Sequence, residues 1–256
     1  MNPWLTATHY LPILTTILSA LFCGVLVQAV RTRRSGPHLA WWAVGAFCYG
    51  AGTLIESAIA LNGNTVELTK AWYVAGALLG GFPLAQGAAF LHVDRRTASA
   101  LGWTMTSLIV VMSVLVVLSP VDLSHFQATR PTGAILGWRW IRFVTPVINL
   151  YAFLFLVGGA VASAVQYARK RTEPARVGGN VLIAVGGLLP GIGGGMAAAG
   201  MVEALYVLEL VGLVLIWGGY GLIVARGQRG HGPLSRGTEG DGGGAEIEVS
   251  PARSAG

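Results

Sequence analysis

Predominantly apolar blocks, each about 20 residues long, follow one another along most of this chain, and this length matches a membrane span. At a rise of 1.5 Å per residue, such a block crosses roughly 30 Å of hydrocarbon as a helix. A soluble protein with a large helical core would need charged helix faces, which these blocks lack. The seven blocks are residues 11–30, 39–61, 71–92, 99–119, 143–167, 178–201 and 203–225. The sequence therefore predicts an all-α, polytopic integral membrane protein with seven transmembrane helices.

Composition and charge support a membrane class. Hydrophobic residues make up 54% of the chain and charged residues 11%, whereas soluble proteins average about 25% charged. The net charge of +6 comes from short basic runs at block ends, which argues against a nucleic-acid partner and for contact with membrane lipids. Cys23 and Cys48 lie inside apolar blocks without metal-ligand spacing, so we expect them to be small hydrophobes.

The distribution of basic residues predicts the orientation of the chain. Thirteen of the 17 lysines and arginines follow the first, third, fifth and seventh blocks, and positively charged loops stay in the cytoplasm. The first ten residues, "MNPWLTATHY", carry no charged side chain. We therefore expect the N-terminus outside and the C-terminus in the cytoplasm. The excess of arginine over lysine favours a bacterial source, and hence a bacterial inner membrane.

Two segments lie outside the blocks. Residues 120–142 contain two prolines and two tryptophans, and we expect this stretch to lie on the membrane surface. Residues 227–256 follow the transmembrane domain of residues 1–226, and their glycine-rich composition predicts a disordered cytoplasmic tail. With no soluble output domain in view, we expect the bundle to act by itself or through a partner protein of the membrane or cytoplasm.

The stretch "GGLLPGIGGGMAAAG", residues 186–200, lacks the Gly-Lys-Ser/Thr ending of a phosphate loop and the serines and charges of a linker. As a membrane helix, it has small residues at four-residue spacing, the GxxxG type of packing surface. These residues are Gly187, Gly191, Gly195 and Ala199, around Pro190. A similar segment, "AGALLGGFPLAQG", contains Pro83 and the polar Gln86. Both segments are either tight packing seams or bendable helices that line a site.

Carboxylates inside apolar blocks are the strongest functional signal. Glu56 lies in the second block and Glu209 in the seventh, both within the outer third of the predicted membrane. A buried carboxylate is costly there, so it faces the bundle interior, pairs, or carries a proton. Thr53 shares a helical stripe with Glu56, and Tyr206 shares one with Glu209.

The fifth block adds Asn149 at a similar depth, with Arg142 just outside it. We therefore predict a candidate ligand site, open to the outside, that contains Glu56, Glu209, Asn149, Tyr206, Thr53 and Arg142. The alternative is a structural cluster, for example an ion pair between Glu209 and Arg142.

Catalytic, metal and cofactor motifs are missing from the blocks. No Ser-His-Asp, His-Glu-x-x-His or paired-aspartate arrangement occurs there, and no two histidines share a helix face at ligand spacing. The two lysines, Lys70 and Lys170, lie outside the last block, which excludes a retinal Schiff base of the microbial rhodopsin type. We therefore predict no catalytic residues, no metal and no cofactor.

Residues 38–92 begin with an aromatic-start helix, "HLAWWAVGAF", and continue through "YVAGALLGG" to "FLH". This run resembles helices two and three of bacterial seven-helix membrane modules, which include N-terminal sensor regions of histidine kinases and stand-alone uncharacterised proteins. The resemblance implies a seven-helix sensor-like module.

These patterns favour a non-enzymatic, sensor-like or accessory membrane protein that binds a small or lipid ligand from the outer side. A small-solute or proton-coupled transporter is the alternative, because Pro83 and Pro190 interrupt glycine-rich helices. An enzyme that acts on lipids is a third possibility.

Overall fold

The computed structural model describes residues 8–32, 36–171 and 173–229, so the predicted disordered tail lies almost entirely outside the described part. Helix dominates this part of the chain, and its only β-type pairing is an isolated bridge between Val121 and Leu136. Seven helical spans are long and apolar enough to cross a membrane, which confirms the predicted number and marks a multi-pass membrane protein. The single-helix spans are α2 (Leu11–Thr32), α3 (Pro37–Asn62), α6 (Arg95–Leu118), α9 (Pro174–Ala198) and α10 (Val202–Arg229).

Two spans are composite. The third consists of α4 (Val66–Trp72), the π-helix η1 (Tyr73–Leu78) and α5 (Phe82–His92). The fifth consists of α7 (Thr145–Ala152), the π-helix η5 (Phe153–Gly158) and α8 (Gly159–Lys170). π-helical turns are rare, and they are frequently found at functional sites.

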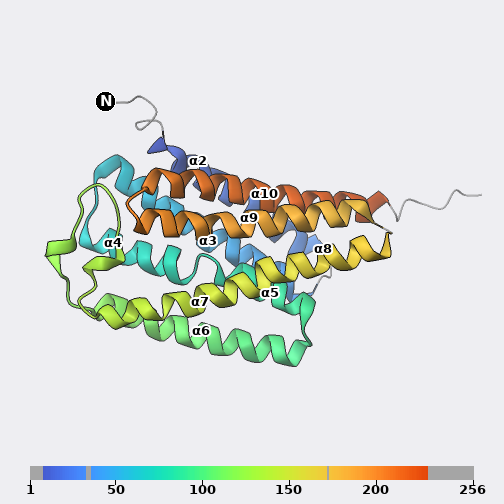
Figure 1. Ribbon diagram of the computed structural model, residues 1–256, viewed down its shortest axis with the longest axis horizontal. Coiled ribbons are helices and arrows are strands. Elements are labelled where there is room, and N and C mark those ends of the chain that lie inside the picture. Colours follow the sequence, from blue (N-terminus) through green and yellow to red (C-terminus); the bar gives the residue numbers. More distant parts are fainter. Residues whose placement is uncertain (1–7, 33–35, 172, 230–256) are drawn as a thin grey trace, which may run out of the picture.

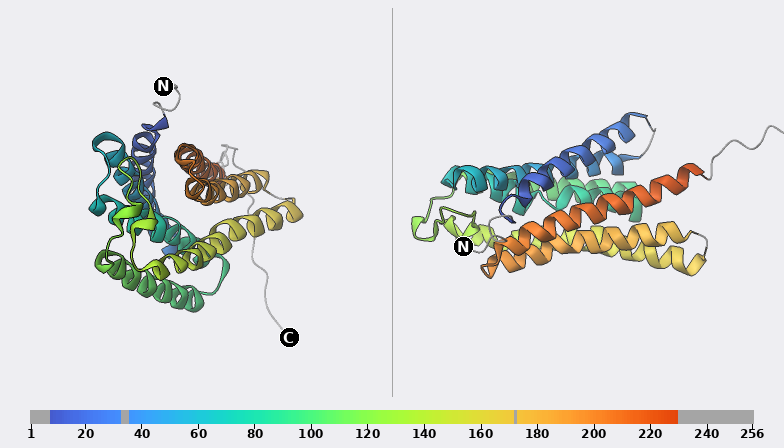
Figure 2. Two further views of the ribbon diagram at one scale, coloured as in Figure 1. Left: turned by 60° about the vertical axis from the view of Figure 1, so that its left-hand side comes forward. Right: turned by 90° about the horizontal axis from the view of Figure 1, so that it is seen from above.

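The helices run roughly along the long axis of the molecule (Figure 1). One end, the loop end, holds the segment of residues 119–144 between α6 and α7, together with the start of α2. The opposite end, the basic end, holds the last residues of α2, α5 and α8. α3 packs against α2 and α5, α10 packs against α2 and α9, and α6 packs on α5 at the far side of the bundle (Figure 2).

The third span is interrupted at residues 79–81, just before Pro83, as in the bendable-helix alternative for this segment. Pro83 lies in the first turn of α5, where its missing N–H leaves no hydrogen bond unmade. A Cβ atom on Gly80 would lie 2.4 Å from the carbonyl oxygen of Gly76, so only glycine permits this path. By contrast, α9 continues through Pro190.

α9 and α10 meet along a row of small residues. A Cβ atom on Gly186 would lie 2.6 Å from the carbonyl oxygen of Gly212, and one on Gly219 would lie 2.4 Å from that of Gly179. The contact positions recur every seven residues, which is the repeat of left-handed helix packing. They are Gly179, Gly186 and Gly193 on α9, and Leu205, Gly212 and Gly219 on α10.

The predicted four-residue stripe is not this contact surface. A Cβ atom on Gly191 or Gly195 would meet no other atom of the described residues within 4 Å, and Ala199 is exposed beyond the end of α9. Gly187 instead packs on Leu156 and Val157 of the fifth span. The expectation was wrong because several glycine spacings coexist in this helix, and the partner helix decides which of them is used.

The segment of residues 119–144 folds back onto the bundle, and it contains the stretch 120–142 for which we predicted a position at the membrane surface. Ile135, Leu136 and Ile141 are at most 1% exposed, and the last two belong to the main hydrophobic core. Asn64 ties this segment to the α3–α4 turn, because its Nδ2 donates to the carbonyl oxygens of Gln127 (2.8 Å) and Arg130 (2.9 Å). The segment therefore forms a folded cap over the loop end.

Candidate functional site

Glu56 of α3 and Glu209 of α10 meet inside the bundle near the loop end. Glu56 lies six residues before the end of α3 and Glu209 seven residues after the start of α10, so both are roughly 10 Å from the helix ends. Glu56 is 2% exposed, and the Oε2 atom of Glu209 is also buried. The structure thus brings together two carboxyl groups that lie far apart in the sequence.

The hydrogen bonds around this acid pair are incomplete unless it holds a proton. The indole Nε1 of Trp72 donates to Oε1 of Glu56 at 2.7 Å. The two carboxyl groups are close enough to interact electrostatically, while Oε2 of each has no donor among the described residues. Ionised carboxylates only accept hydrogen bonds, so a direct bond between them needs one proton on the pair. A buried negative charge is costly in free energy at this depth, and a shared proton removes one of the two charges.

Neighbouring groups hold the acid pair in place. The hydroxyl of Tyr49, two turns before Glu56 on α3, donates to the backbone carbonyl of Glu209 at 2.9 Å and so links α3 to α10. A Cβ atom on Gly52 would lie 3.3 Å from Cα of Gly76, so α3 approaches the π-helical η1 closely. This approach allows Trp72, the residue before η1, to reach Glu56.

A polar pocket of about 320 Å³ opens at the loop end beside the acid pair. Its lining comes from the start of α10, the turn before it, the folded cap and His9. The lining residues are His9, Gln127, Thr129, Arg130, Gly200, Val202, Glu203 and Tyr206. Tyr206 connects the pocket with the acid pair, because it lies one helical turn before Glu209 and its hydroxyl is in electrostatic range of both glutamates.

Arg130 is held at the rim of this pocket by two contacts. One Nη donates to the carbonyl oxygen of Gly200 at 3.2 Å, and Nε donates to the side-chain oxygen of Gln127. Gly200 has a φ of +97°, a conformation that glycine adopts readily and that ends α9 so that α10 can begin. With Glu203 on the first turn of α10, the pocket therefore presents one cation and one carboxylate.

The structure assembles part of the predicted site. Glu56, Glu209 and Tyr206 lie together, and Thr53 lies one turn from Glu56, where its hydroxyl is 2.9 Å from that of Thr16 on α2. Asn149 is instead exposed on α7.

Arg142 is also exposed, in the 3₁₀ helix η4 (Arg139–Phe143). The ion pairs among the described residues include neither Glu209 nor Arg142, so the structural alternative proposed for these two residues is not formed. For Asn149, the position along the chain predicted its depth in the membrane but not its direction. The orientation of α7 turns the Asn149 side chain away from the bundle interior.

Sequence reasoning missed three contributors. Trp72 has the position of an interfacial anchor, yet its indole N–H binds the buried Glu56. Arg130 and Glu203 stand at the ends of connecting segments, and only folding of the cap brings them together. The sequence did contain one signal for the bond between Trp72 and Glu56, because the two residues have similar depths in adjacent antiparallel spans.

Gln86 forms a second buried polar contact. It is fully buried, its Nε2 donates to the carbonyl oxygen of Ala98 on α6 at 2.8 Å, and its Oε1 accepts from the hydroxyl of Tyr151 at 2.5 Å. These contacts link three spans, so Gln86 joins helices rather than facing a ligand. Within the described residues, no three His, Cys, Asp or Glu side chains come together as a metal-ligand set.

Comparison with protein-family models gives no match, and comparison with curated protein sequences gives none either. The resemblance of residues 38–92 to seven-helix sensor modules therefore stays a prediction. The arguments about function below depend on the geometry of the bundle.

Proposed function

We propose that this chain is a non-enzymatic, sensor-like or accessory membrane module that binds a small zwitterionic solute at the loop end. The observation that carries the proposal is the polar pocket, whose lining residue Tyr206 lies one helical turn before Glu209 of the buried acid pair. Its volume of about 320 Å³ suits a molecule the size of an amino acid, near the lower end of typical ligand pockets.

The charges of the pocket support this ligand class. Arg130 can pair with a carboxylate of the solute, and Glu203 can pair with its ammonium group. Tyr206 then transmits occupancy to the acid pair, since a change in its position alters the surroundings of Glu209 one turn away. A module of this kind reports to a partner protein in the membrane or the cytoplasm.

Ligand binding is tested by thermal unfolding of the full-length protein in lipid nanodiscs, with a panel of free amino acids, simple amines and carboxylic acids. A true ligand at 100 times its Kd stabilises the folded state by about 2.7 kcal/mol. We expect Arg130→Gln to abolish the stabilisation by zwitterions. Arg139→Gln is the matched control, because Arg139 is exposed at the same end and does not line the pocket. Equal responses of both variants, or no response to any zwitterion, would contradict the proposal.

Placement in a bacterial inner membrane with the loop end outside belongs to the same proposal. Among the described residues, most lysines and arginines lie at the basic end, and this distribution favours a cytoplasmic position. A reporter fused after Arg229 is expected to be active only in its cytoplasmic form. Activity of a periplasmic reporter at this position would reverse the orientation.

Proton-coupled transport is the second candidate, and the interrupted third span next to the acid pair favours it. Broken helices beside buried carboxylates occur in secondary transporters. We expect proteoliposomes to take up a zwitterionic solute in response to a proton gradient, and Glu56→Gln to abolish this uptake. The control Glu67→Gln changes an exposed glutamate of α4 and is expected to leave uptake unchanged. Ligand binding without proton-driven flux would favour the sensor-like module.

A further inference from the structure

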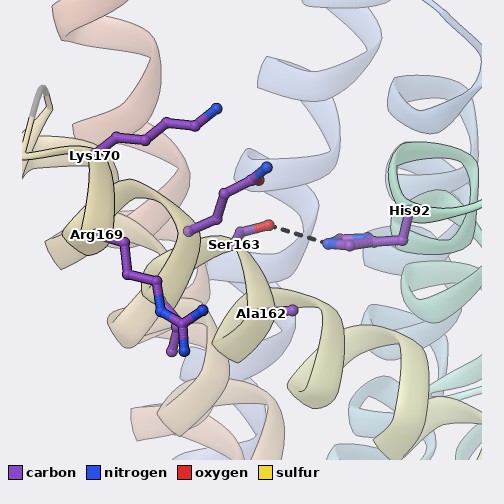
Figure 3. Close-up of a pocket in the computed structure, with 7 residues that line it drawn as sticks. His92, Ala162, Ser163, Arg169 and Lys170 are labelled. Atoms are coloured by element: carbon purple, nitrogen blue, oxygen red, sulfur yellow. Dashed lines mark hydrogen bonds between the residues drawn. The ribbon is translucent and has the colours of Figure 1, made fainter.

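A second hollow, of about 650 Å³, lies at the basic end between α8 and the end of α5 (Figure 3). We name it the basic groove. It is lined by His92, Ala162, Ser163, Val165, Gln166, Arg169 and Lys170. It is separate from the loop-end pocket and shares no residue with it.

His92 forms one wall of the basic groove in a fixed orientation. Its Nδ1 lies 2.8 Å from the carbonyl oxygen of Ala88, which only accepts, so Nδ1 carries a hydrogen. Its Nε2 lies 3.0 Å from the hydroxyl of Ser163 across the groove (Figure 3). A Cβ atom on Gly159 would lie 2.8 Å from the imidazole ring, so this glycine lets the ring rest on α8.

Two cations, Arg169 and Lys170, lie at the end of this groove and have no acidic partner in the described part of the chain. Among the residues that the structure describes, neither Arg169 nor Lys170 forms an ion pair, and no lining residue is acidic. The acids nearest in sequence are engaged elsewhere: Asp94 accepts hydrogen bonds from the first turn of α6, and Glu173 pairs with Arg176. The groove therefore has a positively charged end that favours an anion.

The rest of the groove suits a hydrocarbon chain. Ala162 and Val165 are exposed on the outer surface of α8, in a span that is apolar enough to face lipid. Basic pockets between transmembrane helices on the cytoplasmic side bind anionic lipid headgroups. The adjacency of an apolar surface and two unpaired cations at one bundle end matches the chemistry of an anionic phospholipid.

We propose that the basic groove binds an anionic phospholipid of the adjoining leaflet, with its phosphate at Arg169 and Lys170 and an acyl chain along Ala162 and Val165. Ser163 of α8 and His92, which faces it from the end of α5, also line the groove and supply polar groups to the glycerol region. This site is independent of the function proposed for the loop end.

The test titrates the full-length protein, in a neutral detergent, with short-chain phosphatidylglycerol and follows thermal unfolding. We expect the double variant Arg169→Gln/Lys170→Gln to raise the half-saturating concentration about 30-fold, since each basic residue near a membrane surface contributes about a factor of five. The double variant Arg95→Gln/Arg96→Gln removes the same charge at the same end, outside the groove, and is expected to change it less than about threefold.

A second pair of variants keeps the charge and changes only the shape. Ala162→Phe fills the groove and is expected to weaken binding at least tenfold, whereas Val161→Phe adds the same ring at an exposed neighbouring position that does not line it. This pair decides the question if the double charge variant fails to fold. Equal weakening by Arg95→Gln/Arg96→Gln, equal binding of phosphatidylcholine, or equal stabilisation by glycerol phosphate would overturn the proposal.

Discussion

The glycine row between α9 and α10 allows a sharp prediction from neighbouring positions. Gly219 lies in the row, and a Cβ atom there would be 2.4 Å from the carbonyl oxygen of Gly179 and 2.8 Å from Cγ1 of Ile183. Gly218, the preceding residue, is exposed, and a Cβ atom there would have no neighbour within 4 Å. The same substitution to alanine therefore has opposite surroundings at two adjacent positions of one helix.

The expected loss in unfolding free energy for Gly219→Ala depends on the atom that the new Cβ contacts, the backbone carbonyl oxygen of Gly179. A backbone carbonyl inside a helix cannot rotate away as a flexible side chain does, so α9 and α10 must separate by about 1 Å to reach ordinary contact. Overpacking of this kind typically costs about 1–3 kcal/mol, and we expect Gly219→Ala to lie at the upper end. Gly218→Ala improves helix propensity and meets no atom, so it is expected to be neutral or stabilising by up to about 1 kcal/mol.

The assay is equilibrium unfolding of each full-length variant in mixed micelles with increasing denaturing detergent. Gly219→Ala is expected to unfold at a lower detergent fraction than the original protein, and Gly218→Ala at the same fraction or a higher one. If Gly219→Ala proved as stable as Gly218→Ala, the close approach of the two backbones would be refuted.

Three further substitutions probe other parts of the bundle. Gln86→Leu leaves the buried hydroxyl of Tyr151 without its acceptor and removes the bond to the Ala98 carbonyl of α6. We expect a loss of about 1–3 kcal/mol in unfolding free energy, against no loss for the exposed Gln28→Leu. Asn64→Ala removes the ties to the folded cap, so limited proteolysis is expected to cut residues 119–144 faster than in the original protein. Hydrogen bonds from the side chain and backbone of Thr97 lower the pKa of Asp94. The stabilisation by Asp94 is therefore complete above the unfolded carboxyl pKa of about 3.9 and is lost as the pH falls through the lower folded value. In Asp94→Asn, the free energy of unfolding measured against pH is expected to fall less steeply at acidic pH than in the original protein.

The seven spans were predictable because each requires only a long apolar block, a property local to the sequence. The pairing of Glu56 with Glu209 was accessible for a related reason. Both carboxylates lie at one depth from the same end, and their cost in hydrocarbon directs both to the bundle interior.

Other parts of the site depend on packing between helices, which local patterns do not specify. Asn149 shares the approximate depth of the acid pair, yet α7 presents it outward. Arg130 reaches the pocket only because residues 119–144 fold into a cap that packs on the main hydrophobic core. The position of Trp72 is typical of an interfacial anchor, so its bond to Glu56 became visible only when α3 and η1 were seen to touch.

The acid pair also has a consequence for the order of events during synthesis of the chain. Glu56 lies on the second of the seven spans and Glu209 on the seventh, so Glu56 is synthesised long before Glu209. At about 5–20 residues per second, the interval is on the order of ten seconds. During biogenesis Glu56 therefore has to be kept neutral or hydrated without its partner, and arrival of α10 completes the membrane assembly of the bundle.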